Sequence, residues 1–400
     1  MRVSKDNEHW RSATFRTTLG KVTDQQSVSN YNENRSIRRL FRDRATLMYD
    51  YRRVTPFLSI HCKRISATIA VALGVVTFVC IACETSPPAD LRGTSQLDGF
   101  EHPVMDLHFA SDDTLFCLDR KGTVYLAAFL PAPSMKEVVF TDSDAWRIEC
   151  IRNYNAIAVG HLDGSVGIIS REGLVKGTLR IDGGIVTYLA HSQNTNELAV
   201  ASHDGVSDFG TGGNVEVWSM VDMKRVAKMK TDATPLSVAW RPGGETVAVG
   251  FYGGKVQLIG RDDMLVVVST ALVNPNNHRD AHEVAVSADG SHLAVAAGDS
   301  LVILDGTTLE QVAECPTEGV VTCAAWSPVE NSQIAFAGKG CGVVVWNYQT
   351  NRMIPVFQSV DRVKSIRFAP KGDFLALAVG RQVRVLDVSS ARTADHQRHP

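Results

Sequence analysis

Two stretches of the sequence decide the fold: Leu236-Ser-Val-Ala-Trp-Arg-Pro-Gly-Gly-Glu-Thr-Val-Ala-Val-Gly250 and Val363-Lys-Ser-Ile-Arg-Phe-Ala-Pro-Lys-Gly-Asp-Phe-Leu-Ala-Leu-Ala-Val-Gly380. In both, a short apolar strand is followed by a polar turn with Pro and Gly and by a second apolar strand. A tight turn and a third strand come next. The unit recurs about every 40 to 50 residues from Pro103 to Ser389, a period that indicates a repeat architecture.

The repeats number seven, and each has a strand with alternating side chains. Val247, Val249 and Phe251 fall on one face of such a strand, with Ala248 and Gly250 on the other. A single unit is too short to bury both faces, so neighbouring units must stack around a shared core. The pattern predicts an all-β, seven-bladed β-propeller over residues 95–390, with first strands beginning near Val104, Trp146, Val186, Leu236, His282, Val321 and Val363.

The last repeat lacks a strand that the others have. A fourth strand is predicted in most repeats, for example over Met264–Val268, but the last repeat reaches a polar tail, residues 391–400, without one. Without a fourth strand, the third strand of the last repeat would end the blade with an uncovered edge, and a closed ring needs this edge covered. The segment Ser95–Phe100 is therefore predicted to supply the missing strand and to join the two ends of the domain.

The repeat length and strand order resemble the WD-repeat propeller family over about three quarters of the chain. Asp-Gly turns between second and third strands occur at Asp163-Gly164 and Asp204-Gly205, as in that family. The name-giving Trp-Asp pair is absent, and its place is taken by Trp218-Ser219, Leu304-Asp305, Trp346-Asn347 and Leu386-Asp387. The resemblance implies a rigid ring whose loops bind other proteins.

A charge-free apolar run, Ile65–Cys83, precedes the repeats and has about the length that crosses a bilayer. Lys63 and Arg64 stand before it, and Glu84 follows. By the positive-inside rule these charges predict a single-pass membrane protein with a cytoplasmic N-terminus and an exported propeller. A buried soluble helix, a cleaved signal and a misassigned start remain alternatives, and without insertion the protein would be cytoplasmic.

Residues 1–60 are polar and basic, and their composition predicts disorder. Within them, Arg35–Met48 has apolar residues on one helical face and arginines opposite, which fits either a helix on an anionic membrane surface or a solvated charge run. The whole chain has a net charge of −2, which gives a nucleic-acid partner no electrostatic support.

The sequence offers little chemistry. Gly298-Asp-Ser300 matches an esterase nucleophile motif but occupies a predicted turn, where Gly and Asp serve the backbone. His278, Asp280, His282 and Glu283 could ligate a metal, although solvated loop residues are the simpler interpretation. No catalytic, cofactor or metal site is predicted. The cysteines are read as buried free thiols, with a disulfide between Cys315 and Cys323 as an alternative.

The functional prediction is that loops of the ring bind a partner protein. The insertion His203–Asn214 and the long connection 273–281 stand out. Aromatic residues near the turn after Val249 are predicted to be exposed and to suit a contact surface, although they could equally pack within the blade. The candidate contact residues are His203, Asp204, Asp208, Phe209, Asn214, Arg241, Phe251, Tyr252, Asn276, Asn277, His278 and Arg279. The predicted function is a non-catalytic protein-interaction scaffold, tethered to a membrane through Ile65–Cys83. A soluble cytoskeletal or trafficking adaptor and a propeller hydrolase are the alternatives.

Overall fold

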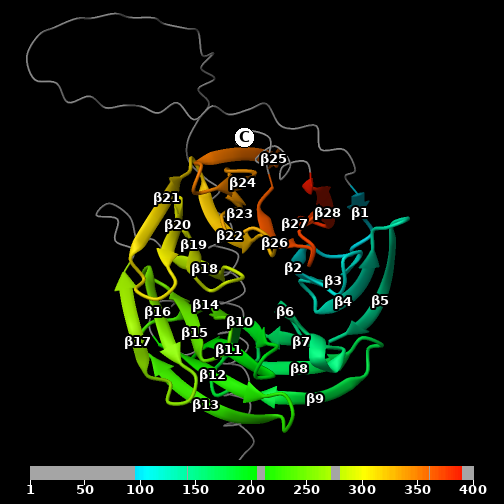
Figure 1. Ribbon diagram of the computed structural model, residues 1–400. Coiled ribbons are helices and arrows are strands. Elements are labelled where there is room, and N and C mark those ends of the chain that lie inside the picture. The colour runs from blue at the N-terminus through cyan, green and yellow to red at the C-terminus, as the bar shows by residue number, and fades with distance from the viewer. Residues whose placement is uncertain (1–94, 142, 205–211, 272–279, 360, 390–400) are drawn as a thin grey trace, which may run out of the picture. The chain divides into compact units, whose positions relative to one another are not determined.

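The computed structural model describes residues 95–141, 143–204, 212–271, 280–359 and 361–389. These residues form seven four-stranded antiparallel sheets, arranged as blades around a ring (Figure 1). The predicted all-β, seven-bladed propeller is confirmed. Within these ranges no helix is long and apolar enough to cross a membrane. The predicted span Ile65–Cys83, the basic region 1–60 and the tail 391–400 lie outside the described residues.

The blades follow one another along the chain, and each begins with its innermost strand. Blade 1 contains β2 (Val104–Phe109), β3 (Thr114–Asp119), β4 (Thr123–Ala128) and β5 (Ser134–Phe140). Blade 2 contains β6 (Ala145–Ile151), the 3-10 turn η1 (Arg152–Tyr154), β7 (Ala156–His161), β8 (Ser165–Ser170) and β9 (Val175–Arg180). Blade 3 contains β10 (Ile185–Ser192), β11 (Glu197–His203), β12 (Gly213–Ser219) and β13 (Lys224–Thr231).

Blade 4 contains β14 (Pro235–Trp240), β15 (Thr246–Phe251), β16 (Lys255–Gly260) and β17 (Val266–Ala271). Blade 5 contains β18 (Ala281–Val286), β19 (His292–Ala297), β20 (Ser300–Asp305) and β21 (Gln311–Pro316). Blade 6 contains β22 (Val320–Trp326), β23 (Gln333–Lys339), β24 (Val343–Asn347) and β25 (Arg352–Phe357). Blade 7 contains β26 (Val363–Phe368), β27 (Phe374–Val379), β28 (Gln382–Asp387) and, from the other end of the domain, β1 (Ser95–Leu97).

The first strands begin within one residue of the predicted positions, but the fourth strand of blade 4 is displaced. It runs from Val266 to Ala271, not over Met264–Val268. Met264 has a φ of +53° and therefore belongs to the turn. Its buried side chain packs into the core between blades 3 and 4, and Asp263 accepts a hydrogen bond from the Leu265 amide at 3.0 Å. Apolar character at Met264 reflects this packing and not a strand.

The N-terminal strand closes the ring, as the sequence predicts. β1 pairs with β28 in antiparallel register, with Ser95 opposite Val385 and Leu97 opposite Val383 (Figure 1). Leu97 and Phe100 are buried in the core that joins blades 7 and 1. The Phe100 carbonyl also accepts a hydrogen bond from Arg381 Nε at 2.9 Å. The two ends of the domain thus hold each other in place.

Apolar residues form seven core clusters, one between each pair of neighbouring blades. The alternation in β15 explains how. Val247, Val249 and Phe251 pack toward blade 3, while Ala248 packs toward blade 5. Because each fully buried aliphatic or aromatic side chain contributes about 1.5 to 3 kcal/mol, neither face of a blade can be left uncovered. This requirement makes the ring the stable form of the repeat.

Cys315 and Cys323, for which a disulfide was an alternative prediction, are free cysteines. Cys315 and Cys323 are both buried and unbonded to each other. Cys315 Sγ lies 3.4 Å from Met353 Sδ, and Cys323 Sγ donates to the Ala337 carbonyl at 3.4 Å. The disulfide alternative is therefore wrong, and both thiols act as small core groups.

Every innermost strand carries a one-residue register shift near its start, for example between Val104 and Asp106 in β2. The shift inserts one unpaired residue and turns the strand, as a β-bulge does. It recurs in all seven blades, and the residues that follow it are Asp106, Arg147, Tyr188, Ser237, Glu283, Cys323 and Ser365. Polar or charged side chains dominate this set.

Candidate functional site

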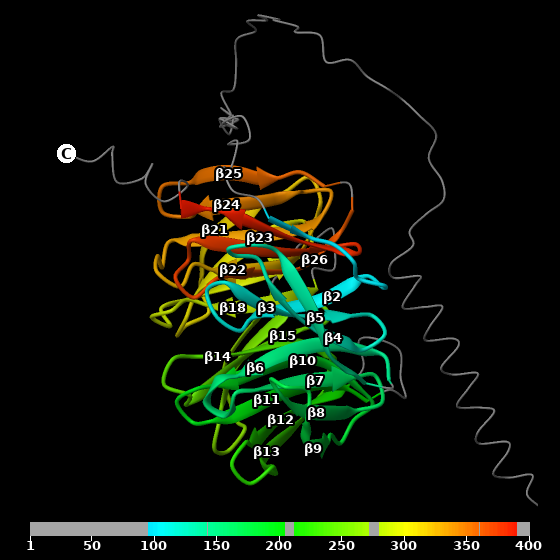
Figure 2. The same cartoon turned by 90° about the vertical axis from the view of Figure 1, so that its right-hand side faces the viewer.

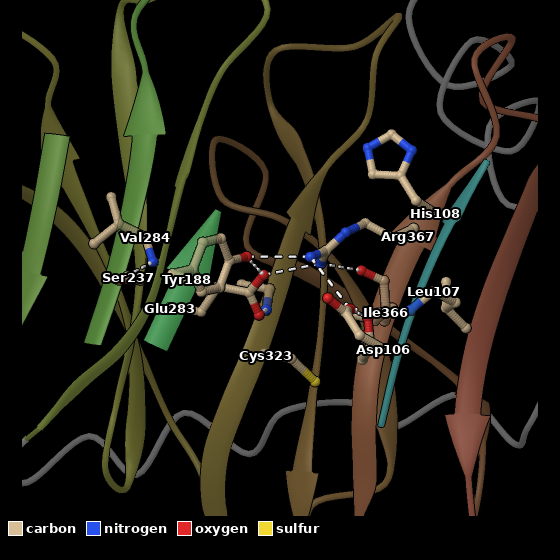
Figure 3. A network of polar contacts seen from close by, with 12 residues as sticks. Asp106, Leu107, His108, Tyr188, Ser237, Glu283, Val284, Cys323, Ile366 and Arg367 are labelled. Carbon is tan, nitrogen blue, oxygen red and sulfur yellow. Dashed lines mark hydrogen bonds and ion pairs between the residues drawn. The ribbon is translucent and has the colours of Figure 1, made fainter. Parts of the chain in front are cut away.

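The central channel is crossed by a hydrogen-bonded network centred on Arg367 of β26. Its guanidinium donates to Glu283 Oε1 of blade 5 at 2.8 Å and to the Tyr188 hydroxyl of blade 3 at 3.1 Å (Figure 3). Asp106 of blade 1 lies 3.8 Å from the same guanidinium. Tyr188 in turn donates to Glu283. Residues from blades 1, 3, 5 and 7 therefore meet through one cation.

Burial and neighbouring groups set the charge states of Arg367, Tyr188 and Cys323. Burial alone disfavours the charged guanidinium, but Tyr188, Glu283 and Asp106 together raise the pKa of Arg367 well above its usual value. Burial raises the pKa of Tyr188 strongly, so its hydroxyl stays protonated and donates. Burial likewise raises the pKa of Cys323, which keeps that thiol neutral. Arg367 is thus charged, whereas Tyr188 and Cys323 are neutral.

The residues at and beside the bulges also link each blade to the next. The Ile148 amide donates to Asp106 at 3.2 Å, Arg147 Nε donates to the Thr187 carbonyl at 3.1 Å, and Thr187 Oγ1 donates to the Pro235 carbonyl at 2.7 Å. The Val284 amide donates to Ser237 at 3.1 Å, the Ala324 amide to Glu283 at 3.3 Å, and Ser365 to Asp106 at 2.7 Å. Cys323 Sγ lies 4.0 Å from the Val363 carbonyl and completes the circle. The channel groups therefore serve as ties between blades.

Three predicted contact residues lie at the insertion between β11 and β12. His203 is fully buried, with Nε2 3.7 Å from Asp204 Oδ1. Asn214 is buried in β12 and donates to the Asp182 carbonyl of the preceding interblade loop. Asp204 is partly exposed, while Asp208 and Phe209 lie outside the described residues. His203 and Asn214 are therefore buried at the base of the insertion, and contact between this insertion and a partner stays a prediction.

The predicted aromatic contact surface in blade 4 is also different in the structure. Phe251 is fully buried at the end of β15, so the prediction that it is exposed is wrong. Lys255 Nζ lies 4.6 Å from its ring centroid. Tyr252 is partly exposed beside it. Arg241 lies at the opposite end of the blade, after Trp240, and donates to the Gly290 carbonyl at 3.3 Å. Arg241 and Tyr252 therefore belong to opposite faces of the ring.

The connection before blade 5 is only partly described. Asn276, Asn277, His278 and Arg279 lie outside the described residues. Asp280 accepts a hydrogen bond from the Gly253 amide at 2.9 Å, and Glu283 belongs to the channel network. These two acids therefore have separate structural roles.

Ser300 differs slightly from its prediction. The turn of the esterase-like motif consists of Gly298 and Asp299, and Ser300 is the first residue of β20. Its side chain is fully buried, and its Oγ has no hydrogen-bond partner among the described residues. A serine nucleophile needs an exposed hydroxyl that is hydrogen-bonded to a base, and among the described residues Ser300 has neither feature.

A groove lies at the rim between blades 2 and 3 and was not predicted. Its volume is about 220 Å³, and we call it the blade 2–3 groove. Its floor belongs to the core between the two blades, and Lys176 Nζ crosses one side to donate to the Tyr154 carbonyl at 2.9 Å. The lining residues are Ile151, Tyr154, Ile168, Lys176, Met220, Val221 and Met223.

One of the most exposed apolar side chains lines this groove. Of the described residues, Leu174, Val221 and Val175 are the most exposed large apolar side chains, at 70%, 68% and 66%. Val221 lines the groove, whereas Val175 stands opposite Ile169, which belongs to the core between blades 1 and 2. Methionine side chains adapt to irregular partners. The groove therefore combines a cavity, two methionines, one exposed aliphatic side chain and one cation.

Local sequence explains how the groove forms. After Ser219 the turn Met220-Val-Asp-Met223 has apolar residues where a polar turn is usual, and Met223 adopts a φ of +54°. Opposite it, Gly177 leaves space on β9, since a Cβ there would lie 3.5 Å from the end of the Met223 side chain. The unusual apolar turn was the signal that sequence reasoning missed.

Comparison with known proteins agrees with this architecture. No protein-family model matches the chain. Among solved structures, the chain is similar to the WD40 β-propeller domain of Doa1, with a TM-score of 0.64 and 16% sequence identity. The match covers 75% of this chain and 99% of that domain. At this identity the likeness concerns the fold, and the described part of the chain has the fold of a WD40-like seven-bladed β-propeller.

Proposed function

We propose that the protein is a non-catalytic interaction scaffold that docks a partner protein in the blade 2–3 groove. The observation that carries this proposal is a cavity between two blades that is lined by Val221, one of the most exposed aliphatic side chains of the described residues. Ile151, Ile168 and Lys176 of its lining lie on strands whose positions are fixed by the ring, so this part of the groove loses little ordering entropy on binding.

The lining predicts the chemistry of the partner segment. The floor of the groove, including Ile168 and Met220, accepts one bulky aliphatic or aromatic side chain. Lys176 donates to one carbonyl and has two further ammonium hydrogens at the mouth of the groove. A carboxylate next to the apolar anchor would meet this cation. The segment recognised is therefore an exposed peptide with a bulky apolar residue beside Asp or Glu.

The hydrolase alternative has less support. Its candidate nucleophile, Ser300, is buried, and the channel acids Asp106 and Glu283 are bound to Arg367 and to backbone amides of neighbouring blades. These contacts favour a structural role for the acids.

The membrane tether remains a proposal from the sequence alone. If Ile65–Cys83 spans a bilayer, replacing Val75 and Val76 by Arg releases the protein into the soluble fraction, because central charges disfavour insertion. A parent protein found in the soluble fraction after carbonate extraction would contradict the tether. The soluble adaptor would then be favoured.

Site-specific cross-linking tests the docking proposal. A photoreactive residue replaces Val221, which lines the groove, or, as a control, Val312, which is exposed on blade 5. We expect discrete adducts in cells from position 221 and not from position 312. Adding Gly177→Leu, which fills the groove without backbone strain, should abolish them. Adducts that persist with Gly177→Leu would contradict docking in the groove.

A further inference from the structure

The outermost strand of each blade forms an open edge at the rim of the ring (Figures 1 and 2). Such an edge presents unpaired backbone groups to any other strand, and proteins usually block it with charges, with Pro or by keeping it short. Six of the seven outer strands in the described part of the chain have such a block. They are β1 with three residues, β5 with Lys136 and Glu137, β9 with Lys176 and Arg180, β13 with Lys224, Arg225, Lys228 and Lys230, β21 with Glu314 and Pro316, and β25 with Arg352 and Pro355.

β17 has no such block. Its sequence, Val266-Val-Val-Ser-Thr-Ala271, contains neither a charge nor Pro, and four of its six residues are β-branched. Leu265 and Val267 are 64% and 62% exposed. The strand pairs with β16 on one side and ends its sheet on the other. It combines high strand propensity with an exposed apolar edge, which is the pattern that promotes strand pairing between chains.

We propose that β17 pairs with β17 of a second copy of this chain, in antiparallel register about a two-fold axis. The strand is suited to a copy of itself because no like charges meet, whereas β13 would place lysines and arginines against each other. The pairing would join two blades into one continuous eight-stranded sheet through an isologous contact.

The flanking charges fit the same geometry. Asp262 and Asp263 lie in the turn before the strand, four and three residues before Val266. In an antiparallel pair, the residues that precede one strand lie beside those that follow the other. The two acidic pairs are therefore separated by about the length of a six-residue strand, roughly 20 Å. At that distance the repulsion between exposed charges is screened at physiological salt.

The size of the contact predicts a weak dimer. One strand and its exposed aliphatic neighbours bury less surface than the roughly 1,200 Å² of a stable interface. We expect dissociation in the range of about 10 to 100 µM, as for transient contacts. This surface shares no residue with the blade 2–3 groove, so the inference is independent of the proposed function.

Sedimentation velocity of the full chain tests the proposal, with detergent present if the chain requires it. We expect dimer to appear as concentration rises from about 1 to 200 µM. Val267→Lys should weaken dimerisation at least about tenfold, since it places two ammonium groups across the axis. Val267→Thr should retain it, and Val312→Lys on blade 5 is the matched control.

Two outcomes would overturn the proposal. One is a monomer at every concentration, in which case the β17 edge could pair only with a strand of another protein. The other is a dimer that Val267→Lys and Val312→Lys affect equally, because self-association would then occur elsewhere in the chain. Since all substituted side chains are largely exposed, the variants should fold, and matching circular dichroism spectra would verify this.

Discussion

Replacing Arg367 by Leu should destabilise the ring more than any comparable change at a surface ion pair. The substitution leaves the Glu283 carboxyl group buried without its cation. It also removes the hydrogen bonds that the guanidinium donates to the Tyr188 hydroxyl and to the Ile366 carbonyl. Removing one partner of a buried pair costs about 3 to 5 kcal/mol. We expect about 3 kcal/mol, at the lower end, because 19% of the Arg367 side chain is exposed.

Urea unfolding of the full chain, followed by tryptophan fluorescence, measures this change. Five of the six tryptophans lie within residues 95–389 and report on the propeller. Arg367→Leu combined with Glu283→Leu should lose less than the sum of the single changes by about 1 kcal/mol or more. Lys371→Ala breaks an exposed 2.9 Å ion pair with Asp112 and should leave the free energy of unfolding nearly unchanged, because solvent screens such a pair. Equal losses for Arg367→Leu and Lys371→Ala would refute the network as a tie between blades.

Three further predictions concern closure, acid sensitivity and the buried hydroxyl. Leu97→Asp should lower the free energy of unfolding by about 2 to 5 kcal/mol, whereas the control Gln96→Ala should have a much smaller effect, because only Leu97 is buried in the closure core. Burial lowers the pKa of His161 below its usual 6.5, so the stabilisation that the neutral imidazole gives the folded state is present above pH 6.5 and is lost as pH falls. The midpoints of urea unfolding at pH 7.5 and 5 should therefore differ less in His161→Asn than in the parent. Ser300→Ala should leave stability equal or raise it by up to about 1 kcal/mol, because its Oγ has no partner among the described residues; a loss above 2 kcal/mol, or loss of an ester-cleaving activity, would contradict this.

Much of the fold could be predicted from the sequence because one pattern is repeated. The alternation in β15 and the turn between β7 and β8 both follow from local rules. In that turn, Gly164 has a φ of +80°, which only glycine adopts readily. The closure by β1 was predicted because a ring with an uncovered edge would be unstable. The position of β17 was misjudged because Met264 is apolar for packing within a turn.

The candidate site was harder to predict. Phe251 and His203 have residue types that suit a contact surface, but their burial depends on neighbouring blades and not on local pattern. The channel network joins Tyr188, Glu283 and Arg367 across 179 positions of the sequence, and no periodicity in the chain indicates that they meet. The blade 2–3 groove likewise combines two blades. Its one local signal was the apolar turn that contains Met220 and Met223.

Peptide display on the immobilised full chain tests docking in the blade 2–3 groove most directly. We expect selected peptides to share a bulky apolar residue next to Asp or Glu. Fluorescence anisotropy should then show at least about tenfold weaker binding to Gly177→Leu and to Lys176→Glu, and unchanged binding to the control Val312→Asp; a tenfold change corresponds to about 1.4 kcal/mol. Selection of no common motif, or peptides that bind Gly177→Leu as tightly as the parent chain, would contradict the proposed scaffold function at this groove.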